Sequence, residues 1–200
     1  MSKATLLLVR HGETDWNAQN RWQGQCDVPL NSLGQAQSRL LGERLARLWR
    51  EGELPQPTRL LTSDLSRATE TAELLQTGLV LERDGRLRER GFGSWEGKTN
   101  AELGHAPGSG ERAPDAEPIE QVWERVVAAL APLEGTALVV GHGGALRAAL
   151  AYVAEMGHEG MRHFTLRNTS LSVVTLAPSG GKLLRVNDTA HLENLINHER

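Results

Sequence analysis

The stretch Thr5–Gly12 (TLLLVRHG) is a short apolar run that ends in an arginine, a histidine and a glycine. A second stretch on the same plan, Thr136–Gly144 (TALVVGHGG), lies far along the chain. Bounded apolar runs of this length are typical of strands buried in a parallel sheet. The carboxyl ends of parallel strands share one edge, where ligands bind. We therefore expect His11 and His142 to lie close together if their two strands are neighbours.

The remainder of the chain alternates helical and strand patterns around these two runs. Helices are expected over residues 32–50 with Asn31 as N-cap, from between Ser63 and Ser66 to before Gly78, over 119–131, and over 144–154. Further strands are expected over residues 59–62, 79–81, 171–176 and 183–186, and the last ten residues are expected to fray. This pattern predicts an α/β fold in which residues 1–200 form a single domain, with a mostly parallel central sheet flanked by helices on both faces.

Charge and cysteine content exclude several classes of protein. The formal charge is −3, from 22 Lys+Arg against 25 Asp+Glu, so no strongly basic footprint for nucleic acid or an anionic membrane is present. The one cysteine, Cys26, cannot form an intrachain disulfide or a cysteine-rich zinc site. The apolar run Leu6–Val9 is too short to span a membrane, and no small-residue cleavage site follows it. We expect a cytoplasmic protein with neither nucleic acid nor membrane as a partner.

The residues near the two histidines favour an anion over a metal as the ligand. A metal ion would be repelled by Arg10, and zinc needs at least a third protein ligand that the neighbouring glycines do not supply. Arg67 stands near the start of its predicted helix, where a cation opposes the helix dipole. An anion shared between Arg67 and that helix terminus would remove the conflict. Taken singly, each histidine is also compatible with a polar loop, and Arg67 with a solvated surface.

Glu89 lies in Leu87–Gly93 (LRERGFG), between two arginines. Such a carboxylate is often part of a surface ion pair. The glycines and the aromatic residues Phe92 and Trp95 that follow also permit an irregular loop that buries Glu89 enough for proton transfer.

Four segments together resemble the signature of a known family. They are Arg10–Thr14 (RHGET), Ser63–Ala72 (SDLSRATETA), Leu87–Gly97 (LRERGFGSWEG) and Val139–Gly144 (VVGHGG). In this order and rough spacing they are similar to the motifs of the histidine phosphatase superfamily, which includes cofactor-dependent phosphoglycerate mutases and many small phosphatases. The resemblance covers most of the chain.

The resemblance implies a role for each matching residue. His11 would be the nucleophile that forms a covalent phosphohistidine, and Glu89 the proton donor. The phosphoryl oxygens would be held by Arg10, Arg67 and His142. The phosphate site would be lined by Thr14, Asn17, Gln23, Gly24 and Gly143. The chemistry agrees, because two guanidinium groups can stabilise the charge that develops on a transferred phosphoryl group. No metal and no cofactor is expected, and the second nitrogen of His11 should donate to a backbone carbonyl.

The distance between the acid and the second histidine favours the compact phosphatase branch. Only 53 positions separate Glu89 from His142, whereas the mutases resembled here carry a long insertion with basic residues that hold a carboxylate. This interval does contain Lys98, Arg112 and Arg125, the last on a predicted helix. The predicted activity is a phosphomonoester hydrolase for small phosphorylated metabolites. The alternatives are a cofactor-dependent phosphoglycerate mutase, an α-ribazole phosphatase, and a non-catalytic protein that binds phosphorylated ligands.

The glycine- and proline-rich loop at 104–118 is expected to act as a lid over the leaving group. His105, Glu111 and Arg112 would contact the leaving group there, or be ordinary solvated residues. The aromatic rings of Trp22, Phe92 and Trp95 would form an apolar wall of the pocket, or belong to the core. Relatives often dimerise, so a homodimer is possible.

Overall fold

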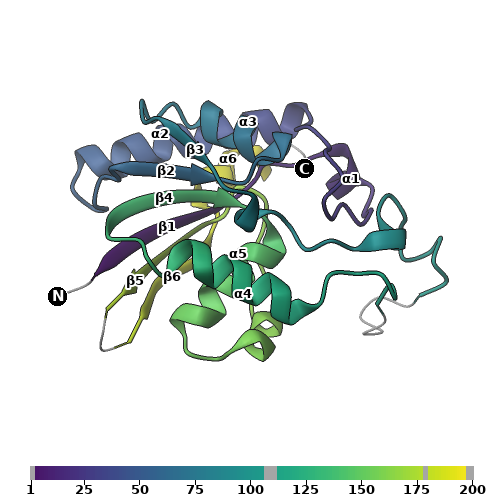
Figure 1. Ribbon diagram of the computed structural model, residues 1–200. Coiled ribbons are helices and arrows are strands. Elements are labelled where there is room, and N and C mark those ends of the chain that lie inside the picture. Colours follow the sequence, from purple (N-terminus) through teal and green to yellow (C-terminus); the bar gives the residue numbers. More distant parts are fainter. Residues whose placement is uncertain (1–2, 106–111, 178–179, 197–200) are drawn as a thin grey trace.

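The computed structural model describes residues 3–105, 112–177 and 180–196. Its six strands are β1 (Ala4–Arg10), β2 (Arg59–Thr62), β3 (Leu81–Arg83), β4 (Gly135–Gly141), β5 (Leu171–Leu176) and β6 (Lys182–Asp188). They form one sheet in the order β3-β2-β4-β1-β5-β6, seen from the side in Figure 1. Strands β1 to β4 pair in parallel, and β5 pairs antiparallel with both β1 and β6. The predicted mostly parallel sheet is confirmed.

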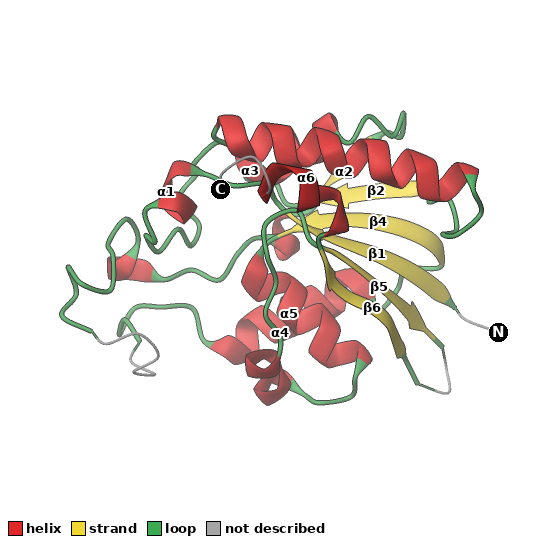
Figure 2. Cartoon of the chain, turned by 180° about the vertical axis from the view of Figure 1, so that it is seen from behind, coloured by secondary structure: helices red, strands yellow, loops and turns green. Residues whose placement is uncertain are grey.

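Helices cover both faces of the sheet, as Figures 1 and 2 show from opposite sides. One face carries α2 (Ser32–Arg50) and α3 (Ser66–Leu74), and the other carries α4 (Ile119–Leu130) and α5 (Gly143–Val153). None of the described helices has the length and apolar character that crossing a membrane requires.

The burial of β1 explains why Leu6–Val9 is continuously apolar. Leu6 and Leu8 pack into the core beneath α4 and α5, whereas Leu7 and Val9 pack into the core beneath α2 and α3. Successive side chains of a strand point to opposite faces, so a strand buried on both sides has no polar position.

The register between β1 and β4 places the two histidines side by side. Arg10 pairs with Gly141 at the carboxyl end of both strands. The backbone N–H of His11 then donates to the carbonyl of Gly141 at 2.9 Å. His11 and His142 therefore leave adjacent strands at the same level of the sheet.

The structure differs from the predicted elements at the sheet edge and in two short helices. The third strand is β3, Leu81–Arg83, and not residues 79–81, because Val80 is 85% exposed and the edge strand uses the cross-strand pair Arg59–Glu82. Helix α1 (Asp15–Ala18) has only four residues, too few for any periodicity to reveal. At the end of the chain, α6 (Glu193–Ile196) forms where fraying was expected, and 197–200 lie outside the described residues.

Candidate active site

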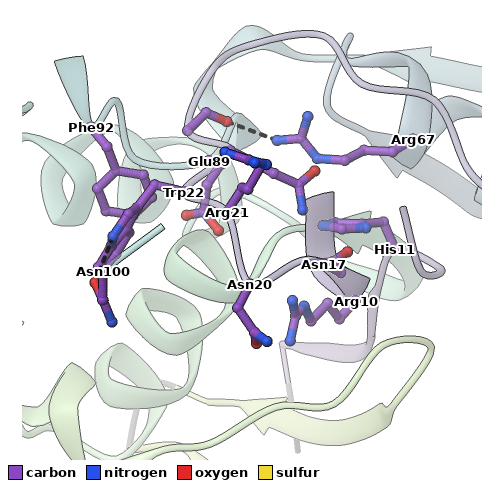
Figure 3. A pocket seen from close by; sticks show the side chains of 12 residues that line it. Arg10, His11, Asn17, Asn20, Arg21, Trp22, Arg67, Glu89, Phe92 and Asn100 are labelled. Carbon is purple, nitrogen blue, oxygen red and sulfur yellow. Dashed lines mark hydrogen bonds between the residues drawn. The ribbon is translucent and has the colours of Figure 1, made fainter. Parts of the chain in front are cut away.

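A cavity of about 280 Å³ opens where β1 ends. Figure 3 shows Arg10, His11, Asn17 and Arg67 at one end of it and Trp22, Phe92 and Asn100 at the other. Predicted site residues in its lining are Arg10, His11, Asn17, Gln23, Gly24, Arg67 and Glu89. The cavity is also lined by Asn20, Arg21 and Asn100, which no sequence motif indicated.

His11 is held in the orientation and protonation state of a nucleophile. Its Nδ1 lies 2.7 Å from the carbonyl oxygen of Gly12. A carbonyl only accepts, so Nδ1 carries the hydrogen and Nε2 is the unprotonated nitrogen. Burial lowers the pKa of His11 well below its ordinary 6.5, and the charges of Arg67 and Arg10 lower it further. The ring is neutral at physiological pH, and the predicted hydrogen bond to a backbone carbonyl is confirmed.

His142 meets His11 as the paired motifs predict, with ring centroids 5.1 Å apart. Arg67 Nε donates to His142 Nδ1 at 3.2 Å. Nε2 therefore carries the hydrogen and donates to the Ser63 hydroxyl at 2.6 Å. Burial, followed by the charge of Arg67, lowers the pKa of His142 well below its ordinary value. Because both ring nitrogens contact protein groups, contact with phosphoryl oxygens stays a prediction for His142.

Two guanidinium groups flank the His11 ring. Arg67 is fully buried and donates to the carbonyls of Gly24 and Cys26, each at 2.8 Å. Arg10 Nη1 donates to the Leu166 carbonyl at 2.6 Å, while its buried Nε has no hydrogen-bond partner among the described residues. Arginine stays charged in proteins, and a buried donor without a partner is costly. The cavity therefore favours an oxyanion.

Backbone N–H groups fix the carboxylate of Glu89 beside these cations. The N–H of Gly144 donates to its two oxygens at 2.9 and 3.0 Å, and the N–H of Arg90 donates to Oε1 at 2.8 Å. A Cβ on residue 144 would overlap Oε1, so only glycine permits this contact. The neighbouring Arg88 pairs instead with Asp64. Glu89 thus belongs to the cavity and not to a surface ion pair with its neighbours.

Asn17 is oriented by a ring of hydrogen bonds around its Oδ1. This oxygen accepts from the backbone N–H of Thr14 and from Asn168 Nδ2, both at 3.2 Å. The Thr14 hydroxyl completes the N-cap of α1 by accepting from the N–H of Asn17. Since Oδ1 is used by the protein, the Nδ2 donor is the Asn17 group that suits an anionic ligand.

A comparison with known families decides the identity of this fold and site. The family model described as histidine phosphatase superfamily (branch 1) matches residues 6–189. The chain belongs to the histidine phosphatase superfamily. A curated relative from Salmonella arizonae, named "probable phosphoglycerate mutase GpmB", is 35% identical over 94% of each chain.

Solved structures of other histidine phosphatases agree with this membership. A mycobacterial glucosyl-3-phosphoglycerate phosphatase superposes with a TM-score of 0.77 at 30% identity, over 92% of this chain and 98% of that one. An Escherichia coli protein described as a candidate α-ribazole-5′-P phosphatase gives a TM-score of 0.80 at 26% identity, over 94% and 97%.

Three of the residues predicted for this histidine phosphatase site are not in the described lining of the cavity: Thr14, His142 and Gly143. Thr14 is fully buried and acts on Asn17 as the helix cap. Gly143 lies beside two residues of the lining, since a Cβ there would sit 3.6 Å from Glu89 Oε2 and 3.8 Å from Arg10 Nε. Direct contact of these three residues with a ligand stays a prediction.

The lid expected for this histidine phosphatase falls partly outside the described residues. Those outside are 106–111, which include Glu111. Directly before these residues in the sequence, the ring of His105 packs against Trp95 with ring centroids 4.8 Å apart. Directly after them, Arg112 is exposed and lines a different cavity. Of the aromatic residues, Trp22 and Phe92 line the active-site cavity as an apolar wall, while Trp95 is buried.

Sequence reasoning missed several residues that hold the site together. Asn168 Nδ2 donates to the carbonyls of His11 and Gly12 at 3.0 and 3.1 Å, and nothing in its local sequence indicates this contact. Ser63, the partner of His142, stands inside a motif that was recognised. Asp27 accepts from the N–H of Ser66 at 2.7 Å and so supplies the anion at the start of α3. A protein carboxylate thus already lies at this helix terminus, and binding of a ligand anion by Arg67 stays a prediction.

Buried histidines predict a loss of stability in mild acid. The pKa of His191 is lowered to about 4 by burial and the charge of Arg44, and those of His11 and His142 are lowered as well. The unfolded chain, with ordinary values near 6.5, then binds more protons below that pH, so stability falls as the pH falls. His191 alone should contribute a loss of ~2 kcal/mol between pH 7 and pH 5.

Urea unfolding at pH 7 and pH 5 measures this loss for wild type and His191→Gln. The variant should lose less stability over this interval, and the exposed-histidine control His163→Gln should match wild type. An unchanged pH dependence in His191→Gln would contradict the assignment.

Proposed function

We propose that this histidine phosphatase is a phosphomonoester hydrolase that acts through a covalent phosphohistidine on His11 Nε2. Its substrates are small phosphorylated metabolites. One observation carries the proposal. A buried, neutral His11 has its Nδ1 hydrogen committed to Gly12, with Arg10 and Arg67 on either side and Glu89 in the same cavity.

In the first half-reaction, His11 Nε2 attacks the phosphorus and the ester P–O bond breaks. The guanidinium groups of Arg10 and Arg67 stabilise the charge on the non-bridging oxygens. Glu89 delivers a proton to the leaving oxygen, which departs as the alcohol.

In the second half-reaction, water attacks the phosphohistidine and the P–N bond breaks. The Glu89 carboxylate accepts the proton of the attacking water, so it returns to its starting state. Inorganic phosphate leaves and His11 again holds an unprotonated Nε2. The polar donors Asn17 and Arg10 would hold the phosphate during both steps.

We propose that no metal ion takes part, because two arginines supply the positive charge that a metal would bring. Within the described residues, no group of three or more His, Cys, Asp or Glu side chains is placed to hold a metal. We also propose that the chain works as one domain in the cytoplasm, without nucleic acid or membrane. A homodimer stays a prediction.

Phosphoglycerate mutase activity is the second candidate, because curated relatives carry that name. A mutase needs basic side chains free to hold the carboxylate of its substrate. The described cavity adds only Arg21 to the two catalytic arginines, and Arg21 is paired with Glu102 at 2.8 Å. Arg125 is committed to the loop of Glu89 at hydrogen-bond distances of 2.6–3.0 Å. This arrangement favours hydrolysis over isomerisation.

A substrate panel tests the proposed function. Phosphate release is measured from aryl and alkyl phosphates, 3-phosphoglycerate and α-ribazole 5′-phosphate, each with and without EDTA, beside a mutase assay primed with 2,3-bisphosphoglycerate. We expect phosphate release from several monoesters that EDTA leaves intact. Isomerisation without phosphate release would favour the mutase, and loss of activity in EDTA that added metal restores would favour a metallohydrolase. Binding without turnover would favour a non-catalytic protein.

A further inference from the structure

Arg125, on α4, contacts the backbone of the segment that carries the candidate acid. Its Nη1 donates to the carbonyls of Arg86 and Arg88 at 2.7 and 2.6 Å, and its Nη2 donates to the carbonyl of Glu89 at 3.0 Å. One rigid, planar fork thus holds three carbonyls of a four-residue stretch. This stretch begins inside the short 3₁₀ turn Gly85–Leu87, leads to Glu89 at the cavity and belongs to none of the strands.

Glu117 pairs with Arg125 and also contacts the backbone that follows Glu89. Its two carboxylate oxygens accept from Arg125 Nε and Nη2 at 2.7 and 2.9 Å, and Oε2 also accepts from the N–H of Gly91 at 3.0 Å. The backbone N–H of Glu117 donates to the Gly91 carbonyl at 2.8 Å. The side chains of Arg125 and Glu117 are only 18% and 16% exposed. Water therefore screens the pair little, and its geometry is well defined.

We propose that Arg125 and Glu117 are positioning residues that aim the Glu89 carboxylate at the leaving oxygen, an inference that rests on the proposed function. Together they fix the backbone on both sides of Glu89, from residue 86 to residue 91. The far end of the side chain is fixed separately by the N–H of Gly144. With backbone and carboxylate both anchored, the acid is held at one place relative to His11.

Glu117 itself belongs to the loop at residues 104–118, in the part that the structure describes. A change in this segment would reach the acid through Glu117 and Arg125, which neither line the described cavity nor contact His11. The pair thus acts on proton donation by placing Glu89; the charge of Arg125 also helps to lower the pKa of His142, and Arg125→Lys keeps that charge. Loss of the pair should impair proton donation while leaving phosphoryl binding and the attack by His11 intact.

Comparing substrates with different leaving groups distinguishes a positioning role for Arg125 from a purely structural role. An aryl phosphate whose phenol has a low pKa needs little help from an acid, whereas an alkyl phosphate needs a proton. The ratio of kcat/KM between these two substrates reports the steps up to phosphorylation of His11. In Arg125→Gln we expect kcat/KM to fall by ~10²-fold for alkyl phosphates and to change little for aryl phosphates.

Two further variants and a matched control complete the experiment. Arg125→Lys keeps the charge but loses the fork, and Glu117→Gln keeps the shape but weakens the pairing, so each should show the same selectivity in milder form. Both remain informative if Arg125→Gln fails to fold. The control is Arg44→Lys, which removes the bidentate contact of a similarly buried pair with Asp188 (side chains 13% and 18% exposed); Arg44 does not line the described cavity.

The possible outcomes separate a failure of the positioning role from a failure of the proposed phosphatase function. A selective loss on alkyl phosphates in the Arg125 and Glu117 variants, absent from Arg44→Lys, supports the positioning role. An equal loss on both substrates, or a loss that Arg44→Lys reproduces, overturns it. Absence of phosphatase activity from the wild-type protein would instead reject the proposed function itself.

Discussion

Replacing His11 by alanine should abolish turnover, with kcat/KM reduced on the order of 10⁴-fold or more for every phosphomonoester. The expected loss is this large because the variant has no atom that can accept the phosphoryl group. Arg10 and Arg67 would still bind the substrate, since neither hydrogen-bonds to the His11 side chain. Steady-state kinetics should therefore show a collapse in kcat with substrate binding retained.

A folding check and a control variant are needed to interpret a loss of turnover in His11→Ala. Thermal unfolding of His11→Ala checks that the buried ring was not essential for folding. His163→Ala removes an exposed histidine on the short 3₁₀ turn after α5 and should behave as wild type. Turnover of His11→Ala within tenfold of wild type, in a folded protein, would reject a histidine nucleophile at this position.

Glu89→Gln should give the second largest effect, and the size should depend on the leaving group. The amide is nearly isosteric and its oxygen can still accept from the N–H of Gly144, but it has no proton to deliver. For alkyl phosphates we expect kcat/KM to fall by ~10²–10⁴-fold, the usual contribution of general acid catalysis. For aryl phosphates with a good leaving group the loss in kcat/KM should be much smaller.

The same variant should slow hydrolysis of the phosphoenzyme, because the Glu89 carboxylate is also the proposed base for water. With aryl phosphates, this predicts a rapid release of the phenol followed by a slower steady state. Glu124→Gln, at an exposed position of α4, is the matched control and should show neither effect. A loss in kcat/KM that is uniform across leaving groups would indicate that Glu89 does not donate the proton.

The sheet and the meeting of the two histidines could be predicted because both follow from local sequence patterns. Strands β1 and β4 are buried on both faces, so each appears as a continuous apolar run with clear ends. His11 and His142 follow those runs directly, and parallel pairing then places them at one edge. Asn31 likewise predicts the start of α2, because its side chain caps the helix by accepting from the N–H of Gly34.

Contacts between distant segments could not be predicted in the same way. Asn168 reaches the backbone of His11 across 157 positions, and Asp27 caps α3 from a loop 39 positions earlier. Arg125 is a further case, since its place on a predicted helix gave no sign of which loop it would hold. Such contacts depend on how the elements pack, and a single sequence carries no periodic signal of that packing. The edge strand β3 was misplaced because apolar Leu79 and Val80 outweighed the polar pairing of Glu82.

The most direct test of a covalent phosphohistidine is to trap it. Wild-type protein is mixed with a phosphate-labelled aryl ester, quenched within milliseconds in base and digested for mass spectrometry, in parallel with His11→Ala. We predict close to one labelled phosphoryl group per active chain, stable in base and lost in acid, on the peptide that contains His11, and none in the variant. Turnover without any labelled peptide, or a label on another residue that persists in His11→Ala, would contradict the mechanism.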